Sequence, residues 1–449
     1  MHLPFQKQKL FDSFNALFRS WDQYNRGLRS FAGAILTRVG VSTAAVLDAV
    51  IVAWLLGKEG LGLFGLLMAM PAILVLLTEL GVSISIPYLV NNRKRDVQRV
   101  LGNSLFAGLL VGFLDFFIWM ALAPLIQARF LRSLPLSWVM AAGISPLVLI
   151  LNLDLASTFR ALQRYALANV MIILPELVIL LSILFMLLLH TLSATVLLPC
   201  IIFSQLTTLA FGLFQVGRLG FKPWPIFNRA LLSESVSFGI RGQMGNAINL
   251  LNYRLDHLIL AALTDLGTVG VYVVATKAAE FFKLIPTAVA FILEPKIARK
   301  NPREASRLAL RLMAPTFLLN LTMIILGYFI GPRLIPLIFS EWSRASLLPF
   351  NILLIGWALR GFVGVLSAFN LGQGYPEINT YSVTLGLVVT ITLDILLIPR
   401  LSVIGAAIAS SAAYASSAAL VLLFFFLLNK QHLKQLPTPE VKAMTADEA

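Results

Sequence analysis

Long apolar stretches recur along the whole chain and constrain its fold more than any other feature. A helix of about 20 apolar residues crosses a bilayer, because a helix satisfies its own backbone hydrogen bonds. The sequence is 58% hydrophobic and 12% charged, whereas soluble proteins have about 25% charged residues. We therefore predict an all-α polytopic membrane protein with about twelve transmembrane helices. The predicted spans are residues 29–56, 61–90, 101–125, 137–158, 167–189, 193–217, 234–263, 267–296, 308–331, 346–370, 377–398 and 401–429.

Basic residues are unevenly distributed among the connections between these spans. The net charge of +14 would suggest nucleic-acid binding in a soluble protein. Here the basic residues cluster in every second connection, as in Arg93–Lys94–Arg95 and Arg299–Lys300. Membrane proteins keep such loops in the cytoplasm. The pattern predicts that both termini are cytoplasmic, and it gives no reason to expect a nucleic-acid partner.

The second half of the chain resembles the first. When Asp48 is aligned with Asp256, Gly62 falls on Gly270 and Pro87 on Pro295 without a gap. An even number of spans in each half makes the repeat parallel, so we predict two six-helix lobes related by a pseudo-two-fold axis along the membrane normal. The predicted parts are an amphipathic cytoplasmic segment (1–28), an N-lobe (29–217), a cytoplasmic linker (218–233), a C-lobe (234–429) and a cytoplasmic tail (430–449).

Polar residues in three predicted spans repeat at helical spacing, at about 100° per residue. Charges at membrane depth are costly unless they face a bundle interior or a wet cavity. We therefore predict that these residues line a polar cavity at matching depth in the two halves. The candidates are Arg38 and Asp48 in span 29–56, Arg241, Asn246, Asn249, Tyr253 and Asp256 in span 234–263, and Lys277, Glu280 and Lys283 in span 267–296.

The three charges in span 267–296 have a structural alternative to lining a cavity. Lys277 and Lys283 each lie three residues from Glu280, so the three charges can neutralise one another on one helix face. Arg241 lies at the edge of its polar stripe. Arg360 is a further isolated positive charge at membrane depth, and we count it as a substrate-binding candidate.

Common catalytic and phosphate-binding motifs are absent from the sequence. It contains no GxxxxGK[ST] loop, no HExxH and no GxSxG, which are the signatures of nucleotide hydrolysis, zinc peptidases and serine hydrolases. Its four His residues are scattered, and it has one Cys. We predict a protein that is not an enzyme, with no catalytic residue, no metal site and no cofactor.

Three segments resemble the polysaccharide flippases, the lipid-linked oligosaccharide exporters of the multidrug/oligosaccharidyl-lipid/polysaccharide superfamily. They cover the first two spans, their partners in the second half, and the last three spans. Their sequences are LDAVIVAWLLGKEGLGLFGLL, LDHLILAALTDLGTVGVYVVATKAAEF and AFNLGQGYPEINTYSVTLGLVVTITLDILLIPRLSVIGAAIAS.

This resemblance implies a flippase in a bacterial cytoplasmic membrane that moves an undecaprenyl-diphosphate-linked oligosaccharide by alternating access, for surface polysaccharide or lipopolysaccharide synthesis. Arg38, Lys277 and Lys283 stand where such flippases have cavity cations, which suit a diphosphate. Asn246, Asn249 and Tyr253 suit sugar hydroxyls. Asp48 and Asp256 would serve in gating or ion coupling, together with Glu280. Membrane lipids, a polysaccharide polymerase and a chain-length regulator are the expected partners.

Three other functions stay open. A drug or cation antiporter of the same superfamily would need an acid-dominated site, and the excess of Arg and Lys at depth disfavours it. A membrane glycosyltransferase or polymerase would need a long outer loop with catalytic acids. A scaffold subunit of a polysaccharide complex would not need charges at matching depth in both halves. The sequence identifies neither the glycan nor the coupling ion.

Overall fold

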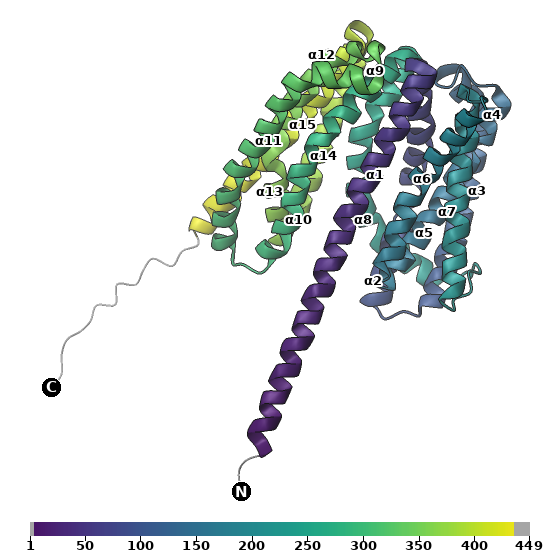
Figure 1. Ribbon diagram of the computed structural model, residues 1–449. Coiled ribbons are helices and arrows are strands. Elements are labelled where there is room, and N and C mark those ends of the chain that lie inside the picture. The colour runs from purple at the N-terminus through teal and green to yellow at the C-terminus, as the bar shows by residue number, and fades with distance from the viewer. Residues whose placement is uncertain (1–3, 435–449) are drawn as a thin grey trace. The chain divides into compact units, whose positions relative to one another are not determined.

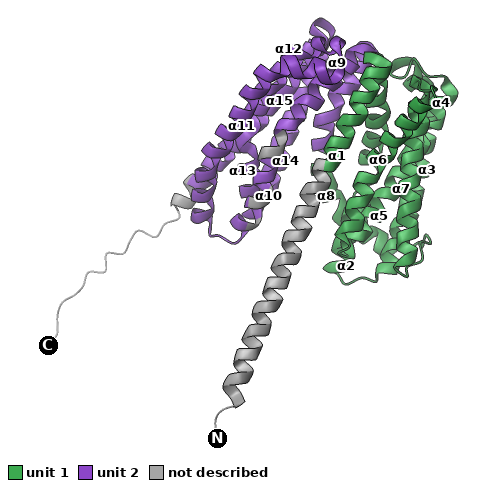
Figure 2. Ribbon diagram, in the orientation of Figure 1, with its two compact units in different colours: residues 1–247 green, residues 248–449 purple. Residues whose placement is uncertain are grey.

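The computed structural model describes the backbone of residues 4–434, and the side chains of residues 40–429 except 283–285, 291, 292 and 295. Residues 4–434 form α-helices and short 3₁₀ turns, with no strand among them (Figure 1). The chain divides into two compact units, residues 1–247 and 248–449 (Figure 2). The division falls within helix α8 (Arg229–Leu263).

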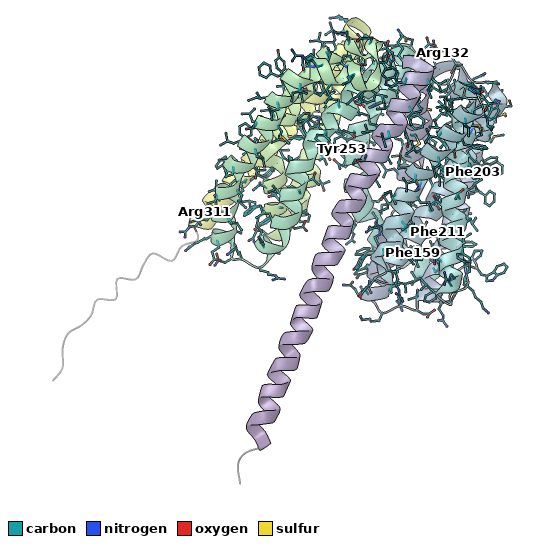
Figure 3. The ribbon with its side chains drawn as sticks, in the orientation of Figure 1. Arg132, Phe159, Phe203, Phe211, Tyr253 and Arg311 are labelled. Atoms are coloured by element: carbon teal, nitrogen blue, oxygen red, sulfur yellow. The ribbon has the colours of Figure 1, made fainter. Side chains whose placement is uncertain are left out.

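Nine helical segments within the described residues are long and apolar enough to cross a membrane. Large apolar side chains cover the outside of both units, as Phe203 does on unit 1, whereas Phe159 lies inside that unit (Figure 3). A soluble monomer rarely exposes so much contiguous apolar surface. The all-α, multi-pass membrane fold predicted from the sequence is therefore confirmed.

Unit 1 is a bundle around α5, which packs against α2, α3, α6 and α7. Leu101, Leu155 and Phe159 are fully buried at the centre of this packing. The elements are α1 (Pro4–Thr78), α2 (Val82–Asn91), α3 (Val97–Arg129), α4 (Leu136–Ala141), α5 (Ile144–Ala161), α6 (Tyr165–Leu188), η1 (Ala194–Val196), α7 (Leu197–Arg218) and the first part of α8.

Helix α1 is interrupted at Gly57, whose φ of 67° and ψ of −165° are not helical. This is where the sequence predicts the turn between the first two spans. A second break separates α1 from α2, because Leu80 and Gly81 both have positive φ. A Cβ on Gly81 would lie 2.2 Å from the carbonyl oxygen of Gly239 on α8. The predicted span over 61–90 therefore contains a helix break, and two glycines allow the close backbone contact there.

Unit 2 holds the rest of α8 and the last spans of the chain. Helix α14 packs along α15, and α10 packs along α13 around buried Leu366 and Phe369. The elements are α9 (Leu266–Glu280), η2 (Phe281–Lys283), α10 (Leu284–Ala298), α11 (Pro302–Phe339), η3 (Glu341–Ser346), α12 (Leu347–Leu359), η4 (Arg360–Phe362), α13 (Val363–Gly372), α14 (Pro376–Leu401) and α15 (Val403–Lys434).

Two of the predicted spans of unit 2, 267–296 and 346–370, are each broken by a 3₁₀ turn, η2 in the first and η4 in the second. Pro286 explains the first break, because its ring lacks an N–H and clashes with the carbonyl four residues earlier. The two broken spans pack together. A Cβ on Gly364 would lie 2.3 Å from the carbonyl oxygen of Pro286, so glycine permits this contact. Transporters commonly bind substrate and coupling ions at such discontinuous helices.

Candidate functional site

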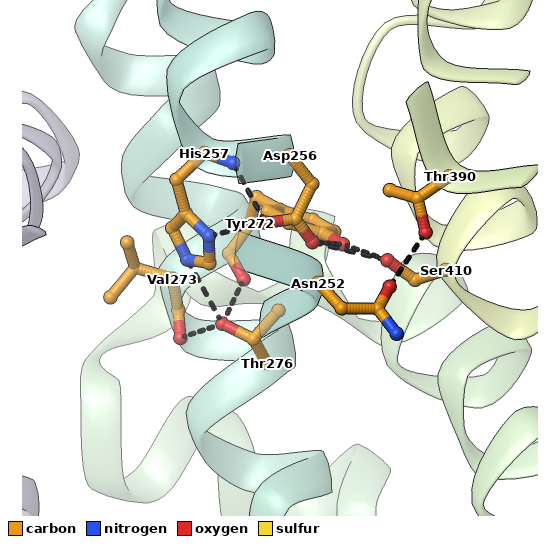
Figure 4. Close-up of polar contacts among 8 residues, drawn as sticks. All are labelled: Asn252, Asp256, His257, Tyr272, Val273, Thr276, Thr390 and Ser410. Atoms are coloured by element: carbon orange, nitrogen blue, oxygen red, sulfur yellow. Dashed lines mark hydrogen bonds and ion pairs between the residues drawn. The ribbon is translucent and has the colours of Figure 1, made fainter. Parts of the chain in front are cut away.

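A hydrogen-bond network in unit 2 is centred on Asp256, which is almost fully buried on α8 (Figure 4). Its Oδ2 accepts hydrogen bonds from the Tyr272 hydroxyl on α9 at 2.6 Å and from the Ser410 hydroxyl on α15 at 3.1 Å. Its Oδ1 accepts one from the backbone N–H of His257 at 2.8 Å. Asp256 therefore connects three helices of the unit.

The imidazole of His257 extends this network. Its Nδ1 lies 2.8 Å from Oδ1 of Asp256, and its Nε2 lies 3.4 Å from Oγ1 of Thr276 on α9. When the carboxylate is ionised it accepts this bond, and Nδ1 carries the proton. A buried carboxylate beside an imidazole can hold or pass on a proton. At helical spacing His257 falls outside the main polar stripe of α8, but its ring lies against the side chain of Asp256.

A second buried carboxylate, Asp394 on α14, interacts electrostatically with Asp256. Neither oxygen of Asp394 has a hydrogen-bond partner in the part of the chain that the structure describes. One turn before these two acids, the Thr390 hydroxyl donates to Oδ1 of Asn252 at 2.9 Å. An isolated ionised carboxylate in an apolar interior costs many kcal/mol. The pair Asp256–Asp394 is therefore suited to a proton or a small cation.

Arg360 lies at the start of η4, where the span formed by α12 and α13 is broken. Its guanidinium carbon is 5.5 Å from the ring centroid of Tyr253, 5.5 Å from that of Trp357 and 4.9 Å from that of Tyr414. These are cation–π distances. The half-buried positive charge is thus held by aromatic rings from three elements, α8, α12 and α15.

The structure brings some of the predicted site residues together and leaves others apart. Tyr253 contacts Arg360, and Asp256 is the centre of the buried network. Asp48 is fully buried in unit 1. The side chains of Arg241 and Asn246 in unit 1 and of Asn249 in unit 2 are exposed, and those of Lys277 and Glu280 are half-buried. The side chains of Arg38 and Lys283 lie outside the described residues.

Unit 1 contains its own buried acids, Glu79 and Asp154. Glu79, at the break between α1 and α2, accepts hydrogen bonds from the backbone N–H of Ser83 at 2.6 Å and from Nε2 of Gln243 at 3.2 Å. Asp154 on α5 is fully buried, interacts electrostatically with Glu79, and has no hydrogen bond to either oxygen from any described residue.

Several contributors to the unit 2 site could not be identified from the sequence. Trp357 and Tyr414 look like ordinary apolar residues of a span, and Ser410 belongs to a stretch of small residues typical of close helix packing. Asn252 and Thr390 are single polar residues in different helices. Among the described residues, no group of three or more His, Cys, Asp or Glu is arranged to hold a metal ion.

The family model described as polysaccharide biosynthesis protein matches residues 31–299, more than half of the chain. No curated protein matches the sequence.

Three solved structures are similar in fold at 13–14% identity. A multidrug resistance MATE family transporter of the MOP superfamily, facing inward, has a TM-score of 0.71 and covers 90% of this chain and 99% of its own. The lipid II flippase MurJ, in an inward closed conformation, has a TM-score of 0.70 and covers 91% and 94%. A MOP superfamily transporter from Pyrococcus furiosus has a TM-score of 0.59 and covers 91% and 96%.

Proposed function

Because this chain belongs to the polysaccharide biosynthesis protein family and has the fold of MOP superfamily transporters, we propose that it is a flippase for a lipid-linked oligosaccharide. Its substrate is an undecaprenyl-diphosphate-linked glycan, which it moves across the bacterial cytoplasmic membrane by alternating access for surface polysaccharide synthesis. The match to the family model over residues 31–299 is the observation that carries this proposal.

The positive candidates bind the diphosphate of the substrate. We assign this role to Arg38, Arg241, Lys277 and Lys283, because charge-assisted hydrogen bonds from Arg and Lys are the strong contacts to phosphate oxygens. Asn246, Asn249 and Tyr253 bind sugar hydroxyls, and the exposure of both Asn side chains within their units is compatible with ligand contact. Arg360 also binds the glycan part of the substrate.

Buried acids couple transport to an ion. Asp256 carries a proton or a small cation together with Asp394, whose oxygens have no hydrogen-bond partner among the described residues. Binding of such a cation relieves the cost of two buried negative charges. Asp48 and Glu280 take part in gating or in the same coupling.

Both termini are cytoplasmic, and a polymerase and a chain-length regulator act with the flippase.

A drug or cation antiporter of the same superfamily is the main alternative. The fold similarity to a MATE family transporter, with a TM-score of 0.71, favours it as much as the similarity to MurJ favours a flippase. A membrane glycosyltransferase or polymerase has less support, because the similar folds belong to transporters.

A transport comparison in vesicles separates these functions. The purified chain is reconstituted into liposomes, and the leaflet exchange of a labelled undecaprenyl-diphosphate sugar is compared with the uptake of a fluorescent cationic drug. A flippase accelerates the first process and not the second. Drug uptake without lipid exchange would support the antiporter and contradict our proposal.

A further inference from the structure

The guanidinium of Arg360 caps a triangle of aromatic rings in unit 2. The ring centroids of Tyr253 and Trp357 are 6.4 Å apart, those of Tyr253 and Tyr414 are 6.2 Å apart, and those of Trp357 and Tyr414 are 5.2 Å apart. Since the guanidinium carbon is about equally far from all three centroids, it sits above the triangle. We call these four residues the arginine cage.

The backbone of unit 2 fixes the cage in position. Trp357 and Arg360 are three residues apart, at the end of α12 and the start of η4, so both lie on one side of the break. The carbonyl of Trp357 accepts a hydrogen bond from Nδ2 of Asn320 on α11 at 3.0 Å. A Cβ on Gly361 would lie 2.9 Å from that nitrogen. Asn320 therefore holds the backbone at the break, and Arg360 lies within a helical segment and not in a loop.

The donors of Arg360 are not used inside the described protein. A guanidinium has five N–H donors in its plane, and no described residue accepts a hydrogen bond from Arg360 or forms an ion pair with it. The three aromatic rings attract the positive charge, but they do not accept hydrogen bonds from these in-plane N–H groups. A half-buried, oriented guanidinium with unused donors is suited to a planar anion that accepts two parallel hydrogen bonds.

The planar geometry of the donors decides which anion fits. A guanidinium presents parallel N–H donors in one plane, and a carboxylate offers two oxygens in one plane. We have assigned the diphosphate of the lipid to Arg38, Arg241, Lys277 and Lys283. The cage consequently suits the carboxylate of a monoanion.

We propose that the arginine cage binds the carboxylate of an acidic sugar, so that the transported glycan contains a residue of the uronic acid type. The carboxylate receives two N–H donors from Arg360, and the rings of Tyr253, Trp357 and Tyr414 position the guanidinium. This inference rests on the proposed transport of a glycan, and it adds the chemical class of one sugar.

Ligand binding to the purified full-length protein tests the cage. The probes are octyl β-glucuronide, octyl β-glucoside and farnesyl diphosphate, with affinity measured by calorimetry. Wild-type protein should bind the glucuronide about tenfold or more tightly than the glucoside. Arg360→Lys, which keeps the charge but loses the paired donors, should remove this preference. Arg333→Lys on the exposed face of α11 is the matched control and should bind like wild type.

Three results would overturn the proposal. They are equal affinity of wild type for glucuronide and glucoside, an unchanged preference in Arg360→Lys, and loss of farnesyl diphosphate binding in Arg360→Lys, which would assign the cage to the diphosphate. The wild-type comparison needs no variant, so a variant that fails to fold does not prevent the test. Leaflet exchange of a neutral undecaprenyl-diphosphate sugar serves as the separate readout of the proposed function. If exchange occurs without a glucuronide preference, only the cage is refuted.

Discussion

Replacing Tyr272 by Phe removes the shortest hydrogen bond to Asp256 and keeps the buried ring. The hydroxyl of Tyr272 lies 2.6 Å from Oδ2 of Asp256, and the residue is fully buried. Phe fills the same space apart from the oxygen, so packing is preserved and the change reports mainly on the hydrogen bond.

The expected loss follows from the contacts that remain. Side-chain hydrogen bonds in membrane proteins average about 0.6 kcal/mol, and those to a charged group contribute about 1.5–3 kcal/mol. After the substitution Oδ2 still accepts from Ser410 at 3.1 Å, and Oδ1 still accepts from His257 at 2.8 Å. We therefore expect Tyr272→Phe to lower the free energy of unfolding by about 1.5 kcal/mol, in the lower part of that range.

A double-mutant cycle with Ser410→Ala makes the test sharper. The hydroxyls of Tyr272 and Ser410 lie 3.1 Å apart and share Oδ2 of Asp256. Each single variant leaves the other donor in place, whereas the double variant leaves that oxygen without either donor. We expect the double variant to lose about 1 kcal/mol more than the sum of the two single variants.

Unfolding by sodium dodecyl sulfate in mixed micelles measures these differences. Tyr328→Phe is the matched control, because Tyr328 is exposed on α11 of the same unit; its effect should stay within about 0.5 kcal/mol. If Tyr272→Phe is as stable as the control, or if the effects of Tyr272→Phe and Ser410→Ala are additive, the hydrogen bonds to Asp256 do not stabilise the protein as proposed.

Two further predictions concern unit 1. Gly239→Ala should lower the thermal unfolding temperature, because its Cβ would lie 2.1 Å from the carbonyl oxygen of Gly81. Gly217→Ala is the control and should not lower it, because no atom lies within 4 Å of its Cβ. Equal unfolding temperatures for the two variants would argue against the close contact of α2 and α8. Asp154→Asn should keep or raise the unfolding temperature, because it removes a buried carboxylate without a hydrogen bond from any described residue. A fall as large as that caused by Asp256→Asn would show that Asp154 has a stabilising partner.

Much of the fold could be predicted from the sequence, because length and hydrophobicity directly limit what spans a bilayer. The predicted span over 101–125 corresponds to α3, and that over 377–398 to α14. The helix breaks at η2 and η4 were not predicted. Pro286 is a local signal for the first, but the second depends on contacts of Gly361 and Gly364 with other helices, which hydrophobicity does not reveal.

The candidate site was predictable only where polarity alone marks a residue. Asp256 stands out as a charge in an apolar span, and it is the centre of the buried network. Its partners Tyr272 and Ser410 come from other helices, so their role depends on tertiary packing. The same holds for Trp357 and Tyr414, whose rings surround Arg360. The roles of Arg38 and Lys283 stay predictions.

Leaflet exchange of a fluorescent undecaprenyl-diphosphate sugar in proteoliposomes tests the proposed flippase activity most directly. We expect the wild-type protein to accelerate exchange over protein-free liposomes. We expect Lys277→Glu, which reverses a charge in the proposed diphosphate site, to abolish this acceleration while the protein remains folded by circular dichroism. Exchange no faster than in protein-free liposomes, or exchange at the wild-type rate in Lys277→Glu, would contradict this proposal.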